Sequence, residues 1–261
     1  MTTTTKVTTD LADGVFTITL DDVDNRNALS RQLAAEFGAA VDRVDMDDDI
    51  RVVVLTNTGS VFCAGADLSE RSSGDRPDGS AEPGDERSPL GFFGSIRRSP
   101  KPWVGRIAGH AIAGGLGLVA SLDISVAVDT AKMGFSEVRI GIAPAIISVV
   151  CLPKMRHADA SAAFLRGNRF LSPEAERLGL INRAVPADEL DAVVDEIVAD
   201  LLLGSPQGLA ACKQVINDVP DKPFDDAMAW ATDLSGRLFE SAEGQEGMKA
   251  YLEKRPPAWT L

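Results

Sequence analysis

The chain has 261 residues, of which 44% are hydrophobic and 25% charged, as in an ordinary globular protein with a sizeable core. Its formal net charge of −13 argues against a nucleic-acid partner, and a polyanionic ligand would need local cations. No apolar run reaches transmembrane length, and residues 1–6 lack the apolar centre of a signal peptide. The three widely spaced cysteines favour a reduced, cytoplasmic protein without a disulfide framework or a zinc site.

The first half of the chain alternates predicted strands and helices. Strands are predicted for the runs at residues 15–20, 52–56, 103–108 and 124–128. Helices are predicted from the N-cap residue Ser30 to about Val44, and over residues 90–96. The run at 52–56 is apolar on both faces, which is typical of a strand inside a parallel sheet. This alternation predicts an α/β core.

Residues 70–89 differ from their surroundings. They are rich in glycine, proline, serine and charge, and they contain almost no apolar side chains. This composition predicts a mobile loop. Since the loop follows the turn at Ala66, it either covers a site or forms a solvated insertion.

The second half of the chain is mainly helical. After about Leu152, helices are predicted for residues 160–165, 173–178, 190–203, 207–218, 224–240 and 245–254. A core followed by a helical region is the expected organisation. Apolar residues cover more than one face of the segment 224–240, which indicates either a subunit interface or a helix buried in a monomer.

Two small-residue turns follow predicted strands. The first surrounds Ala66, and the second precedes an apolar helix and contains Gly109, Gly114, Gly115 and Gly117. Glycines allow another group to approach the backbone closely, and the first turn of a helix leaves N–H groups without partners. For a thioester ligand, the N–H groups of Ala66 and Gly114 are candidate oxyanion donors.

These turns and the segment 135–144 resemble the crotonase (enoyl-CoA hydratase/isomerase) superfamily. The resemblance extends from Asn27 to Pro257. It implies a ClpP/crotonase-like ββα spiral core over residues 1–200 and a C-terminal helical trimerisation region over residues 201–261. It also implies an acyl-CoA thioester substrate and a homotrimer or hexamer. Coenzyme A would enter only as part of the substrate, and no metal or redox cofactor is implied.

Glu137 is the predicted catalytic acid–base group. Its neighbours Phe135, Val138, Ile140 and Ile142 are apolar. Such surroundings raise the pKa of a carboxyl group toward the range useful for proton transfer. The residues alone also allow a surface carboxylate or an ion pair with Arg139 or Arg156. The resemblance favours catalysis, because Glu137 matches the family's second catalytic glutamate by its spacing to Gly141 and Pro144.

The same resemblance assigns binding roles to further residues. Arg26 resembles a basic residue near the coenzyme A phosphates, and Lys254 resembles a C-terminal cation that reaches the nucleotide, often of a neighbouring subunit. As an alternative, both are solvated surface charges. The other predicted binding residues are Ala64, Ala66, Asp67, Leu68, Gly114 and Ala145. His110 and Cys63 are interpreted as packing residues rather than as a base and a nucleophile.

Gly117 departs from the family pattern. Family hydratases commonly carry a second glutamate three residues after the oxyanion-hole glycine, and glycine cannot transfer a proton. A single glutamate fits an isomerase, whereas the motifs around Gly114 and Glu137 resemble the bacterial methylglutaconyl-CoA-type hydratases. We therefore predict an enoyl-CoA hydratase, with an isomerase as the alternative and a non-catalytic acyl-CoA binder as a second alternative.

Overall fold

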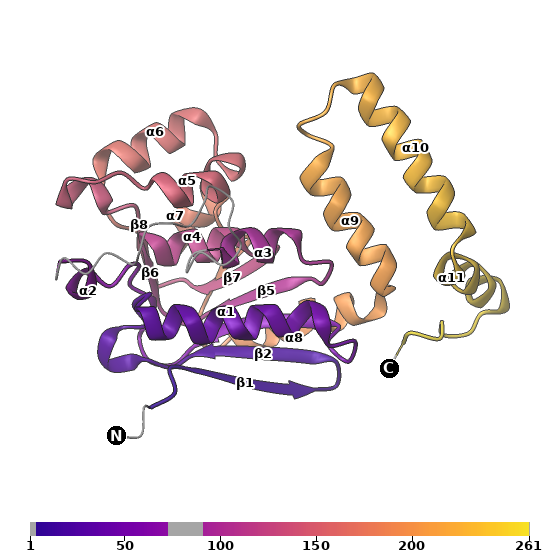
Figure 1. The fold of residues 1–261 in the computed structure, drawn as a ribbon, viewed down its shortest axis with the longest axis horizontal. Helices are drawn as coiled ribbons and strands as arrows, with labels where there is room; N and C mark the ends of the chain where they lie inside the picture. Colours follow the sequence, from indigo (N-terminus) through magenta and orange to yellow (C-terminus); the bar gives the residue numbers. More distant parts are fainter. Residues whose placement is uncertain (1–3, 73–90, 261) are drawn as a thin grey trace.

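The computed structural model describes residues 4–72 and 91–260, and within these ranges two β-sheets form the centre of the molecule (Figure 1). The larger sheet has the spatial order β1 (Val7–Ala12), β2 (Val15–Leu20), β3 (Val52–Asn57), β5 (Trp103–Ile107), β7 (Ile124–Val128) and β10 (Arg183–Val185). Its strands are parallel except that β1 runs antiparallel to β2. The smaller sheet has the order β4 (Val61–Cys63), β6 (His110–Ile112), β8 (Lys132–Gly134) and β9 (Phe170–Leu171).

The chain builds these sheets by repeating one unit. Three times it passes from a strand of the larger sheet to a strand of the smaller sheet, as β3–β4, β5–β6 and β7–β8, and then enters helical structure. The helices that follow these pairs are α2 (Leu68–Ser72) and α3 (Phe92–Arg98), then α4 (Gly114–Ser121), and finally η2 (Glu137–Ile140) and α5 (Ala145–Cys151). The predicted α/β core is therefore confirmed as a repeat of ββα units.

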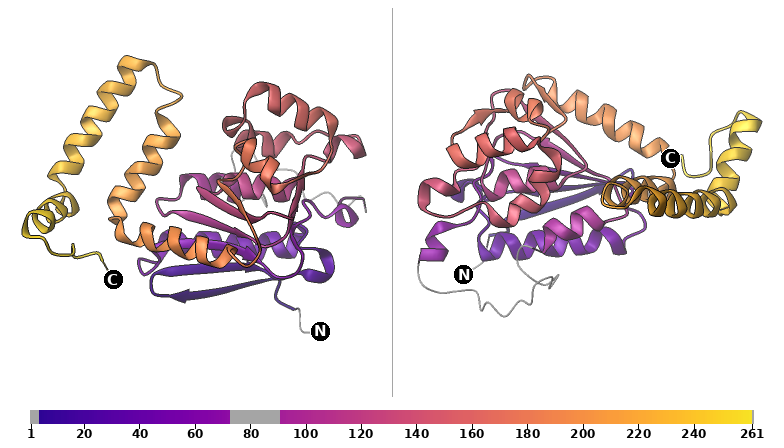
Figure 2. Two further views of the ribbon diagram at one scale, coloured as in Figure 1. Left: turned by 180° about the vertical axis from the view of Figure 1, so that it is seen from behind. Right: turned by 90° about the horizontal axis from the view of Figure 1, so that it is seen from above.

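The central strands β3, β5 and β7 of the larger sheet are largely buried. Helix α1 (Arg31–Met46) covers one face and α8 (Leu190–Leu203) packs against β3, β5 and β7 on the other, as the view from above in Figure 2 shows. All residues of β3 are buried, as expected for an apolar parallel strand. The side chain of Ser30 accepts a hydrogen bond from the N–H of Leu33 at 3.3 Å, which confirms the predicted N-cap of α1.

The remaining described elements are 3-10 helices and α-helices. They are η1 (Val23–Asn25), η3 (Leu152–Lys154), α6 (His157–Arg166), α7 (Ser172–Arg177), α9 (Pro206–Asp218), α10 (Phe224–Glu240) and α11 (Ala242–Glu253). Several predicted boundaries were wrong, and α6, for example, begins at His157 rather than at residue 160. Residues 70–72, predicted as loop, belong to α2 because Asp67 caps that helix, and the rest of the predicted segment 70–89 lies outside the described residues. Helix α11 begins at Ala242 because Ser241 caps it.

Helices α9, α10 and α11 extend away from the two sheets as an arm (Figures 1 and 2). Large apolar side chains of the arm are exposed, including Phe224 at 77%, Phe239 at 62% and Tyr251 at 83%. The arm is the region predicted to assemble subunits, and that role stays a prediction. Among the described helices, none is long and apolar enough to cross a membrane.

A buried ion pair attaches this arm to the core. Lys213 of α9 is 7% exposed, and its Nζ lies 2.7 Å from a carboxylate oxygen of Asp123, which also accepts the N–H of Trp103 at 2.8 Å. The ammonium group also donates to the carbonyl oxygens of Ile96 and Lys101. Burial raises the pKa of Asp123 and lowers the pKa of Lys213. Removing Lys213 therefore leaves the partly buried carboxylate of Asp123 without its nearest cation, with only the more distant charge of Lys154 acting on it.

We expect Lys213→Met to lower the free energy of unfolding by about 2–3 kcal/mol, because it leaves the carboxylate of Asp123 largely buried without its cation. Chemical denaturation measures this difference. Lys249→Met, on exposed α11 surface, is the matched control and should change stability by less than about 0.5 kcal/mol. Equal stability of the two variants would show that the buried pair does not hold the arm.

Candidate active site

A cavity of about 290 Å³ opens between the two small-residue turns and the segment that carries η2 and α5. Its walls are largely apolar, which is typical of a ligand site with a few placed polar groups. It is lined by Leu29, Ala64, Ala66, Leu68, Phe93, Ala113, Gly114, Ser136, Glu137, Ile140, Ile142, Ala143, Pro144, Ala145, Ile146 and Ile147.

The structure brings the two predicted N–H donors together at this cavity. The N–H of Leu29 donates to the carbonyl oxygen of Gly65 at 2.8 Å, and Leu29 and Ala66 form a parallel β-bridge. A Cβ atom placed on Gly114 would lie 3.6 Å from the backbone nitrogen of Ala66. Within the ranges 4–72 and 91–260, neither the Ala66 nor the Gly114 N–H donates a hydrogen bond. Two free donors side by side fit a single developing oxyanion.

Close backbone contact produces this arrangement. A Cβ atom on Gly115 would lie 2.2 Å from the carbonyl oxygen of Cys63, so α4 packs on β4 only with glycine at this position. Gly65 has φ +88°, and a Cβ there would lie 3.0 Å from the nitrogen of Gly114. Ala113, which precedes Gly114, has φ 53° and ψ −121°, a conformation that is strained for any residue with a side chain.

Glu137 begins η2 and lines the same cavity. The residue is 8% exposed, and its Oε2 atom has no hydrogen-bond partner among the described residues. Burial raises the pKa of its carboxyl group. The apolar residues that were predicted to surround this carboxyl group are not equally buried. Phe135 is buried, but Ile140 and Ile142 line the cavity and are each 54% exposed.

The other residues predicted to bind the substrate fall into two groups. Ala64, Leu68 and Ala145 line the cavity together with Ala66 and Gly114. Asp67 does not: its carboxylate accepts hydrogen bonds from Ser69 and from the side chain of Asn25 at 2.8 Å, and these lower its pKa. Asp67 thereby orders the start of α2, whose first residue, Leu68, lines the cavity.

Three further candidates lie outside the cavity. Arg26 is exposed at the end of η1, and its carbonyl oxygen accepts the N–H of Ala64, so it adjoins the first turn. Lys254 is exposed at the end of α11, on the arm rather than beside Glu137. Nδ1 of His110 accepts the N–H of Lys132 at 3.0 Å, and burial lowers its pKa. This geometry supports a packing role for His110.

Cys63 has the chemistry of a packing residue. It is fully buried, its thiol accepts the N–H of Gly65 at 3.4 Å, and burial raises its pKa to about 12. The thiolate that a nucleophile requires is therefore strongly disfavoured.

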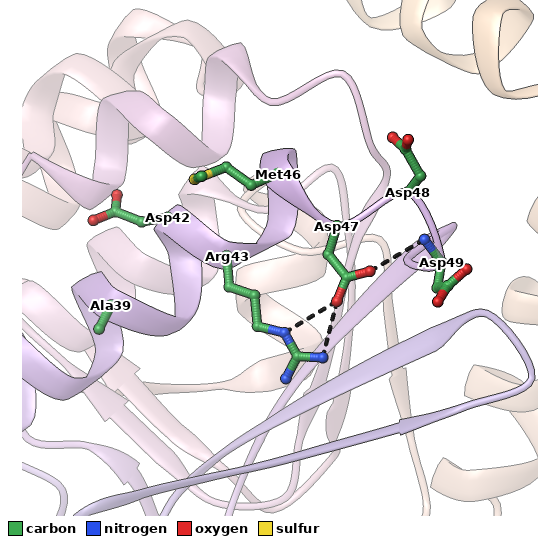
Figure 3. A pocket seen from close by; sticks show the side chains of 7 residues that line it. All are labelled: Ala39, Asp42, Arg43, Met46, Asp47, Asp48 and Asp49. Carbon is green, nitrogen blue, oxygen red and sulfur yellow. Dashed lines mark hydrogen bonds and ion pairs between the residues drawn. The ribbon is translucent and has the colours of Figure 1, made fainter.

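A second hollow lies at the C-terminal end of α1, remote from these groups (Figure 3). It has a volume of about 680 Å³, and its lining includes Asp42, Asp47, Asp48 and Asp49. Its single cationic side chain, Arg43, points to Asp47 and pairs with it at 2.9 Å. An open acidic surface of this kind is unsuited to an anionic coenzyme.

Known proteins are similar to this chain in both sequence and fold. A family model described as enoyl-CoA hydratase/isomerase matches residues 10–261. The chain is 33% identical over 245 residues to the enoyl-CoA hydratase EchA19 of Mycobacterium tuberculosis, covering 92% of this chain and 91% of that protein. It is 31% identical to carnitinyl-CoA dehydratase of Escherichia coli, with 94% of each chain covered.

The crystal structure of an enoyl-CoA hydratase from Shewanella pealeana superposes with a TM-score of 0.89 at 29% identity, covering 97% of this chain and 96% of that one. The chain therefore belongs to the enoyl-CoA hydratase/isomerase family. Its α/β core with a C-terminal helical region is the crotonase fold. The resemblance to methylglutaconyl-CoA-type hydratases within that family stays a prediction.

The raised pKa of Glu137 predicts a pH-dependent stability change. Because the folded-state pKa lies above the usual value of 4.5, the stabilising contribution of the neutral acid is lost as pH rises through the raised pKa. At pH 8 we expect Glu137→Gln to unfold at a higher Tm than wild type, because the amide carries no charge that burial disfavours. Near pH 4 the two proteins should melt together. A Tm difference that does not depend on pH would contradict a buried, titrating carboxyl group.

Proposed function

We propose that this protein moves protons on an enoyl-CoA thioester with Glu137 as its acid–base group. The observation that carries the proposal is one unpartnered carboxyl oxygen in an apolar cavity that also holds two free, adjacent N–H donors. Acyl-CoA chemistry is consistent with the family to which the chain belongs.

In the proposed complex the thioester carbonyl oxygen lies between the N–H groups of Ala66 and Gly114. Negative charge develops on this oxygen when a proton leaves the α-carbon, and the two donors stabilise the resulting enolate. One such donor typically contributes about 3–4 kcal/mol of transition-state stabilisation. Proton transfer of this kind requires neither a metal nor a redox cofactor.

The cavity favours double-bond migration over hydration. Among its described lining residues, Glu137 is the single carboxylate. In migration a C–H bond at C2 of a 3-enoyl-CoA breaks, Glu137 holds the proton, and a C–H bond forms at C4 while the double bond shifts to C2–C3. One base completes this cycle with no change in composition.

Hydration, which the sequence predicted first, is the second candidate. Relatives about 30% identical to the chain carry the name enoyl-CoA hydratase, and this supports it. Here Glu137 would accept a proton from water as its oxygen bonds to C3, and would then deliver a proton to C2. A non-catalytic acyl-CoA binder stays the remaining alternative.

Glu137→Gln distinguishes an enzyme from a binder. It preserves the shape of the side chain but cannot exchange a proton, so we expect kcat for 3-hexenoyl-CoA isomerisation and for crotonyl-CoA hydration to fall ~10²–10⁴-fold. Binding of a saturated acyl-CoA, measured by calorimetry, should remain close to wild type. The control Glu196→Gln makes the same charge change on the exposed surface of α8. Wild-type turnover by Glu137→Gln would rule out its proposed role.

We also propose that the chain assembles as a trimer or a hexamer and that Arg26 and Lys254 contact the coenzyme A phosphates. The exposed apolar side chains of the arm support assembly, because a monomer would leave them in water. Lys254 lies on this arm, away from the cavity of its own subunit. It would therefore complete the site of a neighbouring subunit. The predicted cytoplasmic location remains a prediction.

Light scattering tests the assembly. We expect a mass three or six times the 27.6 kDa of the chain. Replacing Phe224 and Phe239 by serine removes two exposed apolar side chains of α10 and should shift the mass toward that of one chain. Asp225→Ser on the same helix is the control. A wild-type monomer at micromolar concentration would contradict the proposal.

A further inference from the structure

The volume beside Gly117 is filled by a side chain from another helix. A Cβ atom placed on Gly117 would lie 2.2 Å from Cγ2 of Ile147 and 2.6 Å from its Cβ. Ile147 is 4% exposed and lines the cavity, whereas Gly117 is buried and does not line it. The Cγ2 methyl group of Ile147 therefore stands between the α4 backbone and the cavity.

This methyl group affects the choice between two reactions. Hydration breaks one O–H bond of water, forms a C–O bond at C3 and places a proton on C2, so a water molecule must be held beside C3. Holding it requires hydrogen-bonding groups. The side chains with polar atoms that line the described cavity are Ser136 and Glu137, which are consecutive in the chain, and α4 contributes none.

We infer that Ile147 is a specificity-determining residue that keeps water from the position beside Gly117 and thereby directs proton transfer toward double-bond migration. The inference rests on the proposed function and deepens it. A methyl group neither donates nor accepts a hydrogen bond, so water at this position would lose hydrogen bonds on entering. The proton held by Glu137 is then returned to carbon instead of accompanying the addition of water.

Gly117 and Ile147 form a matched pair in packing. Gly117→Ala should be strongly destabilising, because its Cβ would overlap the branched carbon of Ile147. Ile147→Ala removes the 2.2 Å contact with Cγ2 but keeps the Cβ atom at 2.6 Å, so the cost of Gly117→Ala should be smaller, but not abolished, in the Ile147→Ala background. Such a double-mutant cycle measures the coupling of the two positions independently of catalysis.

The functional test compares variants that keep or remove the Cγ2 methyl group. Ile147→Val keeps the Cγ2 methyl group and shortens only the other branch by Cδ1, whereas Ile147→Ala removes both branches. Val149→Ala is the control, because Val149 lies on the same helix, is 67% exposed and does not line the cavity. Each purified protein is assayed for hydration of crotonyl-CoA and for isomerisation of 3-hexenoyl-CoA, and the ratio of the two kcat/KM values is the readout.

We expect Ile147→Ala to raise the ratio of hydration to isomerisation by about tenfold, and Gly117→Glu combined with Ile147→Gly, which also removes the Cβ atom of residue 147, to raise it by about 10²-fold or more, as an added acid–base group would. Ile147→Val and Val149→Ala should keep the wild-type ratio within about twofold. An unchanged ratio in a folded, isomerising Ile147→Ala protein overturns this inference alone. Wild-type protein that turns over neither probe overturns the proposed function and the inference with it.

Discussion

The contact on which the site depends is the backbone-to-backbone packing of α4 against the end of β4. Any side chain at Gly115 would collide with the carbonyl group of Cys63, so the two elements approach as closely as their main chains allow. That approach places the free N–H groups of Ala66 and Gly114 side by side. The donors belong to the scaffold of the two sheets, which holds them without any flexible side chain.

The burial of the Glu137 carboxyl group lowers the stability of the folded protein. Its carboxyl group is buried with one oxygen unpartnered, and the surrounding apolar walls raise its pKa. An unsatisfied buried polar atom typically costs about 1–3 kcal/mol. Ala113, which lines the same cavity, adds backbone strain. Unfavourable local features are therefore concentrated where the substrate is proposed to bind, while β3 at the centre of the larger sheet is buried throughout.

The types and spacing of neighbouring residues were sufficient to predict those features that depend only on residues close together in the chain. The N-cap at Ser30, the buried strand β3 and the two small-residue turns all follow from residue type and spacing. Strands β4, β6 and β8 are only three residues long, which is too short to show a period, so the second sheet was missed. The binding role predicted for Asp67 stays a prediction; the cap that Asp67 forms was missed, although Ser69 two positions later is a sequence signal for it.

Ile147 could not be recognised in the same way. It lies in the apolar run of α5, 30 positions after Gly117. Nothing in the sequence distinguishes it from the core residues Val150 and Cys151 of the same helix. Only the packing of α5 on α4 shows which of these side chains opposes the glycine.

The fit between Gly117 and Ile147 constrains the order in which this site can change during evolution. A larger residue at Gly117 while Ile147 is present creates a steric clash, which single substitutions rarely survive. Shortening Ile147 first leaves a void, a loss of about 2–5 kcal/mol that a well-packed protein sometimes tolerates. A lineage that gains a carboxylate at position 117 is therefore expected to pass through an ancestor with small residues at both positions. Once a large residue occupies position 117, the same clash opposes the return of isoleucine at 147.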